Sequence, residues 1–253
     1  MGDARRHGFA ADADAAAHTF VARLEDDLEL AGDDGHHLAR VLRLGPGEVV
    51  TAADGRGGWR PYAVVEASRT GVRMTATGPA VEEPELAPRL VVAFALTKGT
   101  KPELVVQKVT ELGADALVPV RTQRSVARWS GPRADTATTR LRRIAREAAA
   151  QCRRARLVAV AAPADLGSLA GRAGLVVADR LGVTAAELPE PSGDEWVLVV
   201  GPEGGFDPTE RAALGGAPAL GVGPFVLRAE TAAIAAVAAL AGKRQTRSAF
   251  GSG

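Results

Sequence analysis

Two glycine-rich segments late in the chain are suited to hold a small ligand through backbone groups. Gly201-Pro202-Glu203-Gly204-Gly205-Phe206 directly follows the apolar run WVLVV, and Leu220-Gly221-Val222-Gly223-Pro224-Phe225-Val226-Leu227 leads into Arg228-Ala229-Glu230-Thr231-Ala232. Glycine has no Cβ, so the main chain of such segments can approach a ligand closely. Taken alone, each segment is more simply a strand-to-helix turn, with Thr231 and Glu230 as helix-start residues. Together, in the last two loops of one sheet, they favour a small-molecule site.

Other common ligand and catalytic motifs are absent from the sequence. No Gly-Lys-Ser/Thr follows Gly201, which argues against a phosphate-binding P-loop, and Val226 stands where a dinucleotide-binding fingerprint needs its third glycine. All four histidines precede residue 38, and Cys152 is the single cysteine. We therefore expect no histidine-based triad and no metal site, although His36 and His37 remain available to a site from another domain.

An alternation of apolar runs and helical stretches after residue 89 predicts an α/β domain with a mostly parallel sheet. The runs lack polar interruption, as strands buried on both faces do. We expect strands over 90–96, 116–120, 156–161, 175–179 and 196–200, and helices over 102–112, 132–153, 207–214 and 229–241. Ligands of such sheets lie beyond the carboxyl ends of the strands, where both glycine-rich segments fall.

A smaller β-rich module precedes this domain. Short strand-like runs occupy 19–23, 48–53, 62–67 and 71–75, with Asp54-Gly-Arg-Gly-Gly58 as a hairpin turn and a short helix expected through His36–Leu42. Residues 79–89 contain three prolines and three glutamates without periodicity, which is typical of a linker. We expect a leader over 1–18, a barrel over 19–80, a linker over 81–89, the α/β domain over 90–245 and a tail over 246–253.

The near-neutral net charge of +1 conceals a basic block. Residues 98–156 carry 14 basic and 5 acidic side chains, whereas the regions on either side are acidic. Such a block is equally well explained as a surface for polyanions or as a solvated helix face. The longest late apolar run, Ala232 to Ala241, is half of the ~20 residues that a bilayer helix needs. The single cysteine fits a reduced cytoplasm, and no membrane partner is expected.

The chain resembles the ribosomal small subunit methyltransferase E family, which belongs to the SPOUT superfamily. The resemblance rests on HHLARVLRLGPGEVV and DGRGGWRPYAVV in the first module, and on five blocks of the second: LTKGTKPELVVQKVTELGADALVPV, Arg124-Ser125, Glu147–Gln151, GPEGGF and LRAETA. Cys152-Arg153-Arg154 and Val158 depart from the family pattern.

The resemblance implies methyl transfer from S-adenosylmethionine to N3 of a uridine in 16S ribosomal RNA. It also implies a PUA-like RNA-binding barrel, a SPOUT-type trefoil-knotted α/β domain and a homodimer whose site is completed near the subunit interface. The cofactor residues that it implies are Gly201, Pro202, Glu203, Gly204, Gly205, Leu220, Gly221, Val222, Leu227, Arg228, Thr231 and Ala232.

The chemistry of this reaction selects catalytic candidates. Removal of the N3 proton needs a base, for which Glu203 and Glu230 are the available carboxylates, and Arg228 is suited to stabilise charge on a uracil oxygen. Both carboxylates are equally well explained as helix caps or as ion-pair partners of Arg228. Few aromatic residues are available for stacking, so we expect RNA to be held by charge and shape. The RNA-binding candidates are Arg40, Arg43, Lys98, Lys101, Arg124, Arg146, Arg153 and Arg154.

Two other functions remain open. A SPOUT enzyme that methylates another RNA position, such as a ribose 2′-hydroxyl, would share the fold. A non-catalytic RNA-binding assembly factor would have no need of both glycine-rich segments.

Overall fold

A computed structural model describes residues 9–125, 127 and 129–250. These residues form two compact units, which are considered separately. The first contains residues up to Glu85 together with Ala149–Leu157, and the second contains Leu86–Ala148 and the chain from Val158 onward. The segment 149–157, which falls within the sequence range predicted for the α/β domain, therefore packs with the N-terminal unit.

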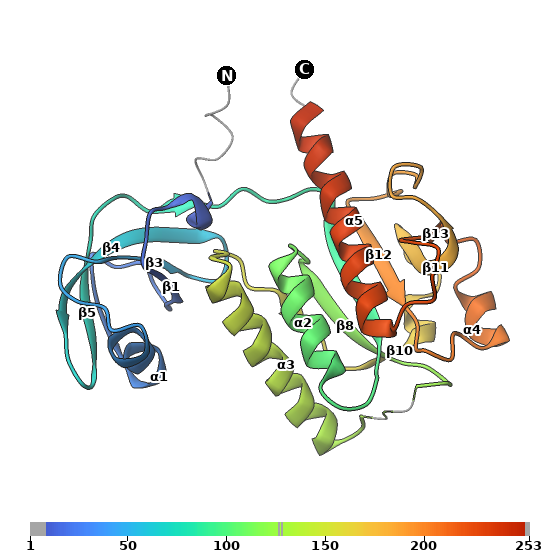
Figure 1. Cartoon of the computed structure of the whole chain (residues 1–253), viewed down its shortest axis with the longest axis horizontal. Coiled ribbons are helices and arrows are strands. Elements are labelled where there is room, and N and C mark those ends of the chain that lie inside the picture. The colour runs from blue at the N-terminus through green and yellow to red at the C-terminus, as the bar shows by residue number, and fades with distance from the viewer. Residues whose placement is uncertain (1–8, 126, 128, 251–253) are drawn as a thin grey trace. The chain divides into compact units, whose positions relative to one another are not determined.

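The N-terminal unit is a curled sheet of six strands (Figure 1). In order they run β1-β3-β4-β5-β2, with β6 paired to β4, and every pair is antiparallel except β1 with β3. Tyr62, Met74 and Val50 are buried inside the curl. The Asp54 carboxylate accepts hydrogen bonds from the backbone of Arg56 and Gly58, which confirms the predicted hairpin turn. The strands are β1 Ala17–Phe20, β2 Asp27–Ala31, β3 Val49–Ala53, β4 Gly58–Ala67, β5 Gly71–Ala76 and β6 Val81–Glu82.

The short helix of this unit begins earlier than predicted. Helix α1 spans Gly32–His36 and continues into a π-turn over His37–Val41. Gly35 therefore lies inside the helix, where a Cβ would stand 2.1 Å from the backbone oxygen of Leu30. Close packing of the helix on β2 explains why this position is a glycine.

The second unit is built on a parallel sheet in the order β10-β8-β7-β12-β11-β13, with β9 paired to β8. Apolar side chains of α2, α3 and α5 pack on one face. Those of the 3₁₀ turn at 166–169 pack on the other face, together with Phe206 and Leu214 on either side of α4. This confirms the predicted fold class. The strands are β7 Arg89–Ala95, β8 Ala116–Arg121, β9 Ala159–Val160, β10 Ala164–Asp165, β11 Leu175–Val183, β12 Glu195–Val200 and β13 Ala219–Leu220; the helices are α2 Lys101–Glu111, α3 Pro132–Gln151, α4 Pro208–Ala213 and α5 Ala229–Phe250.

Several predicted boundaries were wrong. The strand expected over 156–161 is reduced to β9, because the Leu157 amide bonds the Gly55 carbonyl in the N-terminal unit. Helix α5 continues through most of the expected tail. Ala10 of the expected leader is fully buried, while residues 1–8 lie outside the described residues. Strand β6 and the buried Glu83 occupy the start of the expected linker. No helix in the described part of the chain is long and apolar enough to cross a membrane.

Buried and partly buried hydrogen bonds join segment 149–157 to the rest of the N-terminal unit. The Arg153 guanidinium donates to the carbonyl oxygens of Ala13 and Ala15, and the Glu83 carboxylate accepts from the Ala155 amide at 2.9 Å. The His18 imidazole lies 3.1 Å from the Arg154 carbonyl through Nε2 and 2.7 Å from the Thr51 hydroxyl through Nδ1. A carbonyl only accepts, so Nε2 carries the proton, and Nδ1 is left to accept from Thr51.

These contacts predict that the protein loses stability as the pH falls. Burial lowers the pKa of His18 from its ordinary 6.5 to about 4. The unfolded state therefore binds more protons than the folded state between those values, so stability is complete above pH 6.5 and declines down to pH 4. The loss expected from His18 is at most ~3 kcal/mol.

Urea unfolding of the wild type and of His18→Gln across this pH range tests the prediction. The variant should show a shallower pH dependence, whereas His36→Gln, at an exposed position, should behave as the wild type does. Identical slopes for His18→Gln and the wild type would contradict the assignment.

Candidate functional site

A cavity of about 330 Å³ lies at the carboxyl edge of the parallel sheet, between the later part of β11 and the loops that follow β12 and β13. Its wall combines apolar side chains, glycine backbone and a few charged groups. Of the predicted cofactor residues, those that line it are Gly201, Pro202, Glu203, Gly205, Leu220, Val222, Leu227 and Ala232. Gly204, Gly221, Arg228 and Thr231 lie in the same segments without lining it. The cofactor role of all twelve residues stays a prediction.

The chain crosses itself closely beside this cavity. Strand β11 pairs with β13 through Val177 and Ala178, and a second time where Val183 lies opposite Leu220. At the crossing, a Cβ on Gly182 would stand 2.5 Å from the Ala219 carbonyl, and one on Gly221 would stand 2.5 Å from the Gly182 oxygen. The two segments can therefore come this close only because both positions, 182 and 221, are glycine. The predicted trefoil knot, which this crossing does not itself establish, stays a prediction.

The loop after β12 is braced from the loop after β8. The Arg124 guanidinium donates to the Gly204 carbonyl at 2.7 Å, and the backbone N–H of Gln123 donates to the Glu210 carboxylate. Glu210 and Asp207 form a capping box at the start of α4. Arg124, a predicted RNA contact, therefore supports the Gly201–Gly205 loop.

A lysine joins the two candidate catalytic carboxylates. Lys101, at the start of α2, places its Nζ 2.6 Å from Glu203 Oε1 and 3.5 Å from Glu230 Oε2. The hydrogen bond to Glu203 raises the pKa of Lys101, and the Lys101 ammonium lowers the pKa of Glu203. Both groups therefore stay charged over a wide pH range.

Glu230 differs from Glu203 in its surroundings. Its side chain is only 12% exposed, and Oε2 accepts no hydrogen bond, since the contact with Lys101 has ion-pair distance only. A buried carboxylate oxygen without a donor is costly unless a ligand group completes it. Arg228 lies two residues earlier and is exposed, and its guanidinium makes no hydrogen bond or ion pair within the described part of the chain.

The predicted RNA-binding side chains are divided between the units. Arg40 and Arg43 are exposed in the N-terminal unit, and Lys98 is exposed in the loop after β7. Lys101 and Arg124 have the carboxylate and carbonyl partners given above. Arg146 is half-buried on α3, and Arg153 and Arg154 belong to the half-buried segment that fastens to the N-terminal unit. RNA contact by these residues stays a prediction.

Sequence reasoning missed part of the cavity wall. Asp179, Arg180 and Arg211 line it, and Arg211 lies 3.4 Å from the Asp179 carboxylate. The apolar run predicted as a strand ends at Asp179, and only the continuation of β11 to Val183 places Asp179 and Arg180 at the site. In the sequence, the two charged residues Asp179 and Arg180 directly after an apolar run were the pattern that could have indicated a site at this position.

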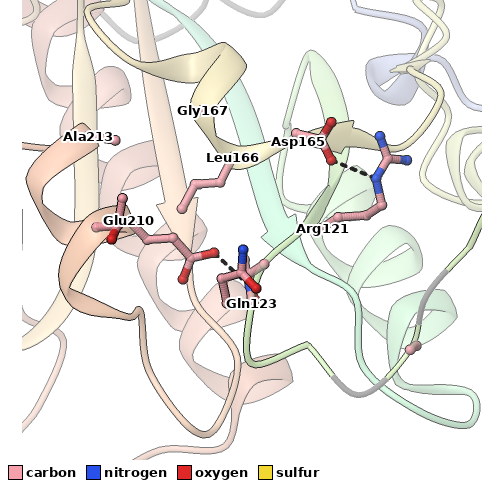
Figure 2. Close-up of a pocket in the computed structure, with 10 residues that line it drawn as sticks. Arg121, Gln123, Asp165, Leu166, Gly167, Glu210 and Ala213 are labelled. Atoms are coloured by element: carbon pink, nitrogen blue, oxygen red, sulfur yellow. Dashed lines mark hydrogen bonds and ion pairs between the residues drawn. The ribbon is translucent and has the colours of Figure 1, made fainter.

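A second cavity of about 380 Å³ lies between the ends of β8 and β10 and helix α4 (Figure 2). Each of its charged side chains has a partner: Arg121 Nε donates to Asp165, and Glu210 accepts from the backbone amide of Gln123. No charged side chain of this wall that the structure describes is left for a ligand, so we assign it no function.

Comparisons with known proteins agree with this geometry. Residues 84–241 match the model of an RNA methyltransferase domain, and residues 30–74 match that of an RNA methyltransferase PUA domain. The chain is 37% identical over 220 residues to ribosomal RNA small subunit methyltransferase E of Mycobacterium bovis, covering 83% of this chain and 84% of the relative. The same enzyme of Bacillus subtilis is 29% identical over 227 residues, covering 84% and 89%.

A solved structure has the same architecture. Lpg2936 of Legionella pneumophila, a candidate methyltransferase solved with the cofactor SAM bound, superposes with a TM-score of 0.78 at 26% identity, over 90% of this chain and 97% of that chain.

Proposed function

This chain belongs to the ribosomal RNA small subunit methyltransferase E family, and from that membership we propose that it methylates N3 of a uridine in 16S ribosomal RNA. It is an S-adenosylmethionine-dependent RNA methyltransferase. The observation that carries the finer proposal is the adjacency of two features. Glu203 lines the ligand cavity and is held by the same lysine that faces Glu230.

The cavity fits S-adenosylmethionine in size and in chemistry. Its volume lies within the ~300–1,000 Å³ of ordinary small-molecule sites, and Leu220, Val222 and Leu227 offer apolar surface to an adenine ring. Asp179 and Glu203 supply carboxylates for hydroxyl and ammonium groups. When bound, the cofactor supplies a methyl group on a sulfonium, which is already activated toward a nucleophile.

Glu230 is the group best placed to take the N3 proton. The Glu203 carboxylate is tied to Lys101 and has a lowered pKa, which makes it a weak base. Glu230 Oε2 has no hydrogen-bond donor and can receive a proton. As the N3–H bond breaks toward Glu230, the electron pair of N3 becomes available for the methyl carbon, and Lys101 holds both carboxylates in place.

Arg228 stabilises the negative charge that spreads onto the uracil oxygens. Its guanidinium is exposed near the cluster formed by Lys101, Glu203 and Glu230, where its charge acts on Glu203. It makes no hydrogen bond or ion pair among the described residues, so its donors are available to a substrate. A charge-assisted hydrogen bond to a developing oxyanion acts mainly in the transition state, where it accelerates the reaction.

RNA affinity comes from exposed cations. Arg40 and Arg43 in the PUA domain and Lys98 beside the cluster contact phosphates, so binding weakens as salt rises. Substrates of this kind place the enzyme in the cytoplasm with the small ribosomal subunit.

A homodimer explains the apolar side chains exposed at the cofactor loops. Leu181, Phe225 and Val226 are 80%, 77% and 88% exposed, and two of them line the cofactor cavity. Burial against a second copy would remove this surface from water and complete the cavity wall. We expect Phe225→Ser with Val226→Ser to shift the protein from dimer to monomer in sedimentation velocity; an unchanged sedimentation coefficient would contradict this interface.

Cofactor binding and transfer together test the proposed function. Titration calorimetry should detect S-adenosylmethionine binding, and a labelled methyl group should pass to small subunits from a strain that lacks the enzyme. Binding without transfer to any RNA would favour an assembly factor, and absence of binding would refute the enzyme.

A further inference from the structure

A third cavity, of about 470 Å³, opens between the start of α3 and the loop after β7. None of its lining residues lines the cofactor cavity. Its wall includes Gly99, Glu103, Trp129, Arg133 and Arg140. The volume is that of an ordinary small-molecule site.

Trp129 supplies this cavity with an aromatic wall. The other two tryptophans, Trp59 and Trp196, are 8% and 0% exposed, and the single tyrosine, Tyr62, is fully buried. Trp129 packs partly against the core of the second unit while it lines the cavity. Every nucleobase has a π-face, and stacking on an aromatic ring is the usual way in which proteins hold unpaired bases. Aromatic residues are few in this chain, and Trp129 is one that lines a cavity.

The charges around Trp129 suit a phosphate. Arg133 is exposed, and its guanidinium makes no hydrogen bond or ion pair in the part of the chain that the structure describes. Arg140 pairs with Glu103 at 2.9 Å, which neutralises the one carboxylate of the wall. Arg133 is left as an uncompensated cation at the rim, where a nucleotide phosphate would bind.

The cavity shares a loop with the candidate catalytic cluster. Gly99 lines the cavity, and Lys101, two residues later, faces Glu203 and Glu230. Lys98, on the other side of Gly99, is exposed. If the target base of a single RNA strand lies at Lys101, Glu203 and Glu230, a neighbouring nucleotide of that strand would lie at this loop.

We propose that the cavity lined by Trp129 and Arg133 binds an unpaired nucleotide adjacent to the methylated uridine, with its base stacked on the Trp129 indole. The inference rests on the proposed function, which it deepens by naming a second base-binding subsite. Its role is to position the RNA, because no group of the cavity contacts the reacting atoms.

Steady-state kinetics with small subunits from a strain that lacks the enzyme test the subsite. We expect Trp129→Ala to raise KM for the subunit about tenfold or more, the loss expected from one stacked base, without changing the Kd for S-adenosylmethionine. Trp129→Phe should recover most of the affinity, and Arg133→Ala should weaken binding and reduce its salt dependence. Arg172→Ala, which removes an arginine paired with Glu195 elsewhere on the unit, is the matched control. The proposal would be overturned by an unchanged KM in Trp129→Ala. An unchanged KM in the double variant that combines Trp129→Phe with Arg133→Ala would overturn it as well.

Tryptophan fluorescence tests the subsite independently of catalysis. Because Trp59 and Trp196 are buried, a single-stranded oligouridylate should quench the emission of Trp129 saturably, and Arg133→Ala should weaken this quenching. If the wild type transfers no methyl group, the proposed function fails while the quenching still decides the subsite. Absence of saturable quenching in the wild type would overturn the subsite.

Discussion

Replacement of Glu230 by glutamine should lower kcat for methyl transfer by roughly 100- to 10,000-fold, the range expected for loss of a general base. The amide is isosteric with the carboxylate and cannot accept the N3 proton. Glu230 does not line the cofactor cavity, so the Kd for S-adenosylmethionine should stay within a few-fold of the wild type. Single-turnover transfer to unmodified small subunits and cofactor calorimetry measure the two quantities.

Two further variants make this result specific. Glu111→Gln removes a carboxylate that pairs with Lys108 on α2, away from the cluster, and should leave kcat unchanged. Glu203→Gln should reduce cofactor affinity as well as kcat, because Glu203 lines the cavity. Transfer by Glu230→Gln within about threefold of the wild type would exclude Glu230 as the base.

Gly221→Ala should reduce cofactor affinity about 100-fold, because it displaces the crossing of two backbone segments at the cavity. The added Cβ would stand 2.5 Å from the Gly182 carbonyl oxygen, a contact that only a backbone shift relieves. Overpacking strain of this kind costs about 1–3 kcal/mol, and a cost of ~2.7 kcal/mol in the bound form corresponds to a 100-fold loss of affinity. Gly242→Ala, on α5 and outside the cavity lining, places its Cβ in open space and should bind nearly normally. Calorimetry on both variants, with circular dichroism to check folding, measures the difference; normal binding by Gly221→Ala would show that the crossing does not shape the site.

Short patterns in the sequence correctly predicted the features that depend mainly on neighbouring residues, namely the buried strands and the glycine-rich loops. The uninterrupted apolar runs of β7, β8 and β12 indicated a parallel sheet, and the glycine-rich segments after β12 and β13 lie around one cavity as predicted. The family and its cofactor were identified from these blocks together.

The misses come from contacts between segments far apart in the sequence. The pairing of Val183 with Leu220 brings Asp179 and Arg180 to the cavity, and no periodicity signals a strand that continues past a charged pair. The bond between Leu157 and Gly55 shortens a strand that hydropathy alone would extend. Lys101 was predicted to bind RNA because of its charge. Its hydrogen bond to Glu203 depends on the fold, which brings Lys101 Nζ to 2.6 Å from Oε1 of a residue 102 positions away in the sequence.

The position of the transferred methyl group tests the central claim most directly. Small subunits from a strain that lacks this enzyme would be incubated with the protein and S-adenosylmethionine, and the 16S RNA digested to nucleosides and mapped by mass spectrometry. The proposed function predicts 3-methyluridine at a single position, absent when Glu230→Gln replaces the wild type. A methyl group on a ribose 2′-oxygen, or on any base atom other than uridine N3, would contradict it.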